Sequence, residues 1–156
     1  MKRIFYWLPP IVWMGVIFYL STDEFSSQNT GSWLETILDY FRISLTTETL
    51  NSIHFVIRKA AHLAGYGILT LLFYRAVRSG RSPRWNFRTA VMGFVLATAY
   101  AIFDEVHQSF TQQRTASTLD VMVDGIGGII ALVVLRFILT ARDEAISQAR
   151  LRSADR

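Results

Sequence analysis

Long apolar blocks, separated by short charged segments, dominate the chain. Helices are expected over about residues 4–20, 53–77, 89–108 and 119–139. A helix needs about 20 apolar residues to cross the hydrocarbon core of a bilayer. Because each block comes close to that length or exceeds it, the pattern predicts an all-α polytopic membrane protein, built as a four-helix transmembrane bundle.

The first block, which follows two basic residues, has two interpretations. A basic start before an apolar run is typical of a secretory signal peptide. We favour an uncleaved anchor helix, because residues 21–23 lack the small-residue pattern of a cleavage site. Proline interrupts the hydrogen-bond ladder of a helix, so Pro9 and Pro10 predict a kink.

The arginines predict the orientation in the membrane. The linker 75–88 contains five arginines and no acid, whereas the segment 21–52 is mainly acidic. Basic residues are enriched in cytoplasmic loops. We therefore expect a bacterial inner (plasma) membrane protein with the linker and both termini in the cytoplasm, and with the first loop and the 109–118 loop outside.

Two segments outside the apolar blocks also show helical character. Residues 31–44 place apolar and charged side chains on opposite faces, which predicts an amphipathic interfacial helix in the first extracytoplasmic loop. A plain loop helix outside the membrane is the alternative. Residues 1–140 are expected to form a single transmembrane domain, and 141–156 a polar cytoplasmic tail that begins as a helix.

Composition excludes several classes of function. Cysteine is absent, which excludes disulfides and cysteine-ligated metals. The net charge of +4 comes from residues beside the apolar blocks. Because they form no basic patch interleaved with aromatic residues, we expect membrane lipids as partners and no nucleic acid. Metal-ligand spacings such as H-x-x-x-H are absent and nearby cations compete with a metal, so no metal and no cofactor is expected.

Charged residues within the last three blocks fall at one depth. Counted from the arginine linker at about 1.5 Å per residue, Arg58, Asp104 and Asp124 all lie within about two turns of the outer surface. An unpaired charge in a membrane costs several kcal/mol, so the three helix faces are expected to converge. The cations are Arg58 and Lys59, and the acids are Asp104, Glu105, Asp120 and Asp124.

Small residues four positions apart allow helices to pack closely. The pairs with this spacing are Ala60/Ala64, Ala61/Gly65, Ala97/Ala101 and Gly127/Ala131. We expect the converging helices to meet along these pairs.

The charged segments resemble the VanZ-like family. Residues 58–66, R-K-A-A-H-L-A-G-Y, are similar to its R-K-x-x-H-x-x-x-Y element. Residues 104–110, Arg114 and residues 120–127 resemble its D-E-x-x-Q-x-F…R…D-x-x-x-D/N-x-x-G element. The resemblance extends to about residue 139. It implies a cell-envelope role, since the family is named for an accessory protein of resistance to the glycopeptide antibiotic teicoplanin.

The candidate catalytic residues are Asp104, His62, Glu105 and Asp124. Carboxylates serve as general acids and bases, and histidine exchanges a proton near neutral pH. Consecutive helix positions diverge by about 100°, so we expect Asp104 to face the site and Glu105 to face away. The structural alternative for the acids is ion pairing with Arg58 or Lys59.

The candidate substrate-binding residues surround this acid–base group. Arginine binds phosphate and carboxylate groups through paired hydrogen bonds. We expect Arg58, Lys59 and Arg114 to bind an anion, and Asp120 alternatively to close a capping box with Ser117. The complete set is Arg58, Lys59, Tyr66, Arg114, Gln108 and Asp120.

Three classes of function follow from these residues. The first is an outer-face site that binds or processes an anionic envelope substrate, either a lipid-linked phosphate or a precursor carboxylate; whether it is an enzyme stays open. The second is a non-catalytic scaffold or accessory protein whose charged network is structural. The third, a small ion-coupled transporter, is disfavoured because no duplicated halves are visible.

Overall fold

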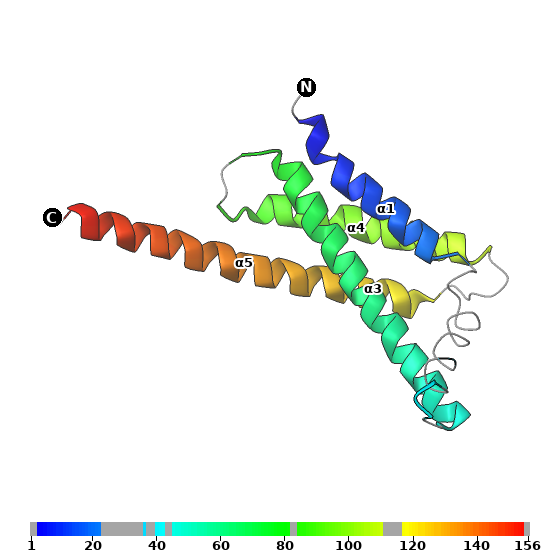
Figure 1. Ribbon diagram of the computed structural model, residues 1–156. Helices are drawn as coiled ribbons and strands as arrows, with labels where there is room; N and C mark the ends of the chain where they lie inside the picture. The colour runs from blue at the N-terminus through cyan, green and yellow to red at the C-terminus, as the bar shows by residue number, and fades with distance from the viewer. Residues whose placement is uncertain are drawn as a thin grey trace.

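The computed structural model describes residues 3–22, 36, 40–42, 45–81, 84–110 and 117–154, and over these residues it is helical without strands. Its longer helices cross one another, with α3 passing over α4 and α5, while α1 runs obliquely to α4 and approaches its C-terminal end (Figure 1). The elements in chain order are η1 (Ile4–Tyr6), α1 (Leu8–Leu20), α3 (Thr47–Arg78), α4 (Phe87–Gln108) and α5 (Thr118–Ala154). The predicted all-α class is confirmed.

Three helices are long and apolar enough to cross a membrane, within the residues that the structure describes: Thr47–Arg78, Phe87–Gln108 and Thr118–Ser153. They correspond to the last three predicted spans. The first block is shorter, because α1 has 13 residues, or about 20 Å at 1.5 Å per residue, against a hydrocarbon core of about 30 Å. The four-span bundle therefore stays a prediction, and most of the segment 31–44 lies outside the described residues.

The proline pair marks the start of α1. Pro9 and Pro10 lie in its first turn, where a missing N–H costs no internal hydrogen bond. The predicted kink is instead a change of helix type before the prolines, since Trp7 separates the 3-10 turn η1 from α1.

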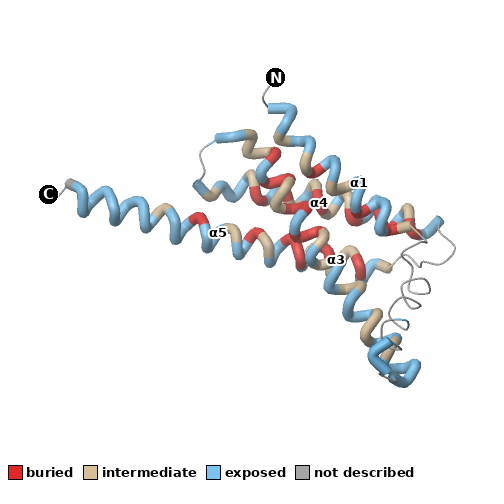
Figure 2. The backbone as a smooth tube through the Cα atoms, in the orientation of Figure 1, coloured by how far each residue is buried: buried red, intermediate tan, exposed pale blue. Residues whose placement is uncertain are grey.

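Two helices extend beyond the predicted spans. α3 begins at Thr47, with the Thr46 side chain accepting a hydrogen bond from the amide of Thr49 (3.3 Å). α5 continues through residue 140 to Ala154, which confirms that the polar tail begins as a helix. Both extensions are largely exposed, while buried residues gather where the helices cross (Figure 2).

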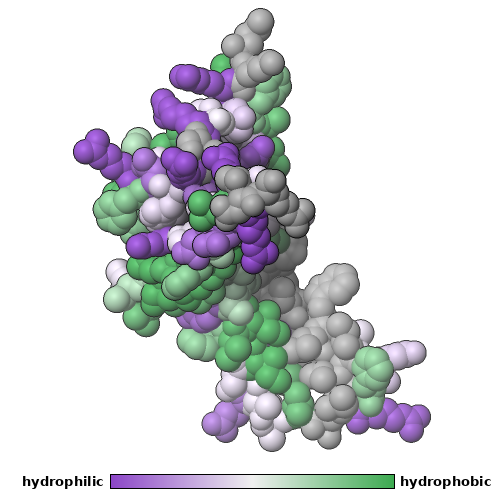
Figure 3. Space-filling view, turned by 90° about the vertical axis from the view of Figure 1, so that its left-hand side faces the viewer, coloured by the Kyte–Doolittle hydropathy of each residue, from purple (hydrophilic) through white to green (hydrophobic). Residues whose placement is uncertain are grey.

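The molecule separates polar from apolar surface. In a view from the left-hand side of Figure 1, hydrophilic side chains gather over the upper part and a hydrophobic area lies directly below (Figure 3). Apolar side chains on α4 and α5 are widely exposed, among them Val95, Ile129 and Phe137. Such a surface fits contact with lipid acyl chains.

Glycines set the closest helix contacts. A Cβ added at Gly127 of α5 would overlap the backbone carbonyl of Leu63 on α3, and one at Gly93 of α4 would lie 2.9 Å from the amide nitrogen of Tyr74. Of the predicted small-residue pairs, Gly127/Ala131 meets α3 at Gly67, and both Ala97 and Ala101 are buried.

The other two small-residue pairs do not form such contacts. Ala60, Ala61 and Ala64 are exposed, and Gly65 has open space beside it. The expectation for Ala60/Ala64 and Ala61/Gly65 was wrong, because α3 turns its opposite face, with Leu63 and Gly67, toward α5.

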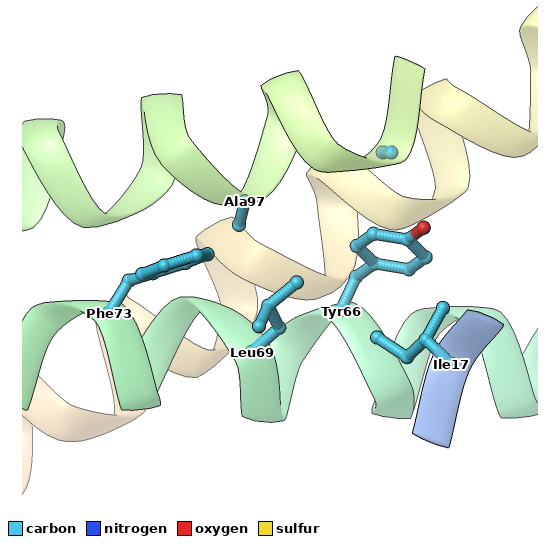
Figure 4. Close-up of a cluster of buried hydrophobic side chains, with 6 residues drawn as sticks. Ile17, Tyr66, Leu69, Phe73 and Ala97 are labelled. Carbon is cyan, nitrogen blue, oxygen red and sulfur yellow. The ribbon is translucent and has the colours of Figure 1, made fainter. Parts of the chain in front are cut away.

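The main apolar core joins three helices. Ile17 of α1 and Tyr66, Leu69 and Phe73 of α3 pack with Ala97 of α4 (Figure 4). In a membrane such packing stabilises helix association mainly through van der Waals contact. Tyr66 is also one of the predicted site residues, so the core holds this candidate side chain in place.

Candidate functional site

Polar side chains from four segments meet at one end of this core. We call this group the polar cluster. It comprises Ser21, which follows α1; Arg58, Lys59, His62 and Tyr66 of α3; Asp104, Glu105 and Gln108 of α4; and Asp120 and Asp124 of α5. The predicted convergence of the three charged helix faces is therefore present in the structure.

Two cations share one carboxylate at the accessible part of the polar cluster. Nη2 of Arg58 donates to Oδ2 of Asp120 (3.3 Å), and Nζ of Lys59 donates to Oδ1 of Asp120. The side chains of Arg58 and Lys59 are 32% and 21% exposed, whereas that of Asp120 is 2% exposed. This group of three has a net charge of +1 and is the part that solvent reaches.

Asp120 is an ion-pair partner and does not close a capping box. The Ser117 amide, which a capping box would pair with this carboxylate, donates instead to Oε2 of Glu105 (2.6 Å). A negative charge at the start of a helix is favourable because of the helix dipole. Glu105 thus stabilises the start of α5 from the neighbouring helix.

Asp104 accepts three hydrogen bonds on one oxygen. Its Oδ2 binds the hydroxyl of Ser21 (2.9 Å), the hydroxyl of Tyr66 (3.2 Å) and Nε2 of Gln108 (3.0 Å). Oε1 of Gln108 in turn accepts from Nη2 of Arg58 (3.4 Å). Asp104 is 1% exposed, so neutral donors stabilise its charge, and Gln108 links it to the cations.

Asp124 pairs with His62 rather than with Lys59 or Arg58. The Nδ1 atom of His62 lies 3.1 Å from Oδ1 of Asp124, and the two side chains are 10% and 1% exposed. A carboxylate on Nδ1 fixes the orientation of an imidazole and leaves Nε2 for a second partner. The structural alternative that paired Asp124 with Arg58 or Lys59 was wrong, because Asp124 lies one turn beyond Asp120 and meets His62, one turn beyond Arg58.

Both adjacent acids of α4 are buried. Asp104 is 1% and Glu105 6% exposed, so the side chain that was expected to face away from the site is also buried. Their side chains do diverge: Asp104 points to Ser21 and Tyr66, and Glu105 to the start of α5. α4 is flanked on two sides, so both directions lead into the protein.

Several polar atoms of the cluster have no hydrogen-bond partner among the described residues. They are Oδ1 of Asp104, Oε1 of Glu105, Oδ2 of Asp124 and Nε of Arg58. Buried polar atoms normally have a partner. The cluster therefore has capacity for additional hydrogen bonds, as a donor near Arg58 and as an acceptor along its acids.

Sequence reasoning missed Ser21, which directly follows the first apolar block. Arg114 lies outside the described residues. Within the described residues, no three His, Asp or Glu side chains are grouped closely enough to hold a metal ion. The described cluster is held together by ion pairs and hydrogen bonds.

Long apolar helices around an internal set of ionised side chains define an integral membrane protein with a polar site between its helices. The chain belongs to the VanZ/LLP1 family, whose model matches residues 6–139. That match confirms the resemblance seen in the sequence. The comparisons with curated proteins and with solved structures give no match.

Proposed function

We propose that the polar cluster binds an anionic group of the cell envelope, a lipid-linked phosphate or a precursor carboxylate, at the outer face of the bacterial plasma membrane. A link to glycopeptide resistance belongs to the same proposal and rests on the family. The observation that supports anion binding is that Arg58 and Lys59 share the carboxylate of Asp120. These two partly exposed cations share one carboxylate, so this part of the polar cluster keeps a local excess of positive charge, although the whole cluster has four acids and two such cations.

The geometry supports binding by exchange of partners. An arriving phosphate contacts the accessible parts of the Lys59 and Arg58 side chains, while Asp120 stays as a counterion. Arginine and lysine form charge-assisted hydrogen bonds to such anions. The acid–base candidates within this proposal are Asp104 and His62, with Asp124 orienting His62 and Tyr66 orienting Asp104.

Binding of a polyprenyl monophosphate in lipid nanodiscs tests this proposal, with the uncharged polyprenol as the ligand control. Arg58→Gln is expected to weaken phosphate binding about tenfold or more, since hydrogen bonds to charged groups contribute about 1.5–3 kcal/mol. Arg142→Gln is the matched control, because Arg142 pairs with Asp143 in the exposed part of α5. Equal affinities of the two variants would overturn the proposal.

The change in affinity expected for Asp120→Asn is opposite in sign to that expected for Arg58→Gln. Loss of the competing carboxylate frees both cations, so the variant is expected to bind the phosphate more tightly than the natural chain. In an electrostatic scaffold, the same change only removes two ion pairs and lowers stability. The sign of the change in affinity therefore separates a binding site from a structural network.

The scaffold is the second candidate, and the burial of Asp104 favours it. A carboxylate that is 1% exposed and held by donors from three segments has a sufficient structural reason to be present. Arg58→Gln then lowers the amount of folded protein in the membrane, and neither it nor the natural chain distinguishes the monophosphate from the polyprenol.

A further inference from the structure

An apolar groove lies between α4 and α5, away from the polar cluster. It has a volume of about 230 Å³, and its floor contains Ala90 and Leu132. Both floor residues belong to a small buried cluster with Tyr74. Arg136 also lines the groove; it follows Asp120 by 16 residues, or about 24 Å along α5.

Side chains with several contacts form one edge of the groove. Trp85, at its edge, stacks on the buried ring of Tyr74, with ring centroids 5.6 Å apart and planes at 16°. The hydroxyl oxygen of Tyr74 accepts a hydrogen bond from the amide of Asn86 (3.4 Å). These contacts position Trp85 and the start of α4 at one edge of the groove.

One charge sign surrounds the Arg136 end of the groove. Arg136 and Arg88 are exposed, and Arg88 directly follows Phe87, which lines the groove and is 71% exposed. Neither residues 75–90 nor residues 130–142 contain an acid. A ligand that matches both parts has a hydrocarbon chain for the groove and a negative headgroup for the arginines.

We propose that this groove is a specific site for an anionic phospholipid, with an acyl chain between α4 and α5 and the phosphate at Arg136. Tryptophan at the headgroup level, here Trp85, is typical of membrane interfaces. A second copy of the chain fits less well, because a two-fold contact through this surface places the same arginines opposite one another. The site is independent of the proposed function of the polar cluster.

Native mass spectrometry of the full chain tests the site, with phosphatidylglycerol and phosphatidylcholine of identical acyl chains as probes. Val133→Trp fills the groove from its lipid-facing side, since Val133 lines the groove and is 47% exposed. The adjacent Val134→Trp is the matched control, because Val134 is 51% exposed and does not line the groove. Arg136→Gln tests the contact with the lipid headgroup, and Arg142→Gln is its matched control.

The site predicts that phosphatidylglycerol binds more tightly than phosphatidylcholine. Val133→Trp is expected to lower its affinity relative to Val134→Trp, and Arg136→Gln to lower it about tenfold relative to Arg142→Gln. Equal effects of Val133→Trp and Val134→Trp would show non-specific annular lipid and overturn the proposal. A loss of dimer mass confined to Val133→Trp would assign the groove to a second copy, and competition by glycerophosphate alone would assign binding to the headgroup without the groove. Either result also overturns it.

Discussion

The hydroxyl of Tyr66 donates a hydrogen bond to Oδ2 of Asp104 across 3.2 Å and so joins α3 to α4 inside the molecule. The same oxygen binds Ser21, just after α1. One buried carboxylate thus ties three segments together. Tyr66 also packs in the apolar core with Ile17 and Leu69, so the core and the polar cluster are coupled through this side chain.

Removal of this hydroxyl is expected to destabilise the protein without opening a cavity. Tyr66→Phe keeps the ring in the core and leaves Asp104 with two donors, which predicts a loss of about 1–2 kcal/mol in the free energy of unfolding. Denaturant titration in detergent micelles measures it. In an Asp104→Asn background Tyr66→Phe is expected to lower the free energy of unfolding by less, because the effects of changes within one hydrogen-bond network are not additive. Equal losses in both backgrounds would contradict the hydrogen bond between Tyr66 and Asp104.

The sequence predicted which residues converge, but not how they pair. Convergence follows from the cost of an unpaired charge in a membrane, and it holds for Arg58, Asp104 and Asp124. The choice of partners depends on how α3 is rotated against α5, which the spacing within one helix does not determine. The contact of Gly127 with the backbone of Leu63 sets that rotation and brings His62, rather than Lys59, to Asp124.

The burial of the acids on α4 was harder to predict than the direction in which each side chain points. The divergence of Asp104 and Glu105 along α4 correctly separates their partners, but the helix has protein on both sides. Ser21 was missed for a related reason, because nothing in a single serine after an apolar block indicates that α1 ends beside a carboxylate of α4. Such contacts between distant segments appear only when the helices are placed in space.

Gly127 is expected to be the most sensitive glycine of α5. Gly127→Ala places a methyl group against the carbonyl of Leu63, which is backbone and has no rotamer to change. Overpacking of this kind costs about 1–3 kcal/mol and forces α3 and α5 apart. The thermal midpoint in detergent is therefore expected to fall.

Gly125→Ala is the matched control for that change. A Cβ at Gly125 meets only the ring of Phe94, at 3.8 Å, and alanine is the better helix former by about 1 kcal/mol. This variant is expected to be as stable as the natural chain or more stable. Equal losses in the two variants would show that α3 does not pass close to Gly127.

The pair of His62 and Asp124 gives a rescue experiment. His62→Gln removes the partner of a buried carboxylate, and such a loss costs about 3 kcal/mol or more. The double variant His62→Gln/Asp124→Asn replaces the pair by two neutral amides, and most of the stability is expected to return. Denaturant titrations of both single variants and the double variant measure the coupling.

Lys59 supplies the control for this rescue. If Asp124 paired with Lys59, then Lys59→Gln/Asp124→Asn would restore stability and the histidine double variant would not. In the structure Lys59 binds Asp120, so the effects of Lys59→Gln and Asp124→Asn are expected to be close to additive. Strong coupling between these two changes would contradict the arrangement of the polar cluster.

The position of the polar cluster relative to the membrane is testable because the natural chain has no cysteine. Thr118 begins α5 beside the cluster and Thr140 follows 22 residues later, about 33 Å along the helix, which matches a hydrocarbon core of about 30 Å. Both residues are exposed. In intact cells, a membrane-impermeant maleimide is expected to label Thr118→Cys but not Thr140→Cys, and permeabilised cells are expected to show both labelled.

The reverse pattern would place Arg58 and Lys59 at the cytoplasmic face, where they would meet cytoplasmic anions in place of envelope precursors. Labelling of both variants in intact cells would mean that α5 does not cross the membrane between residues 118 and 140. The agreement between helix length and bilayer thickness would then be a coincidence.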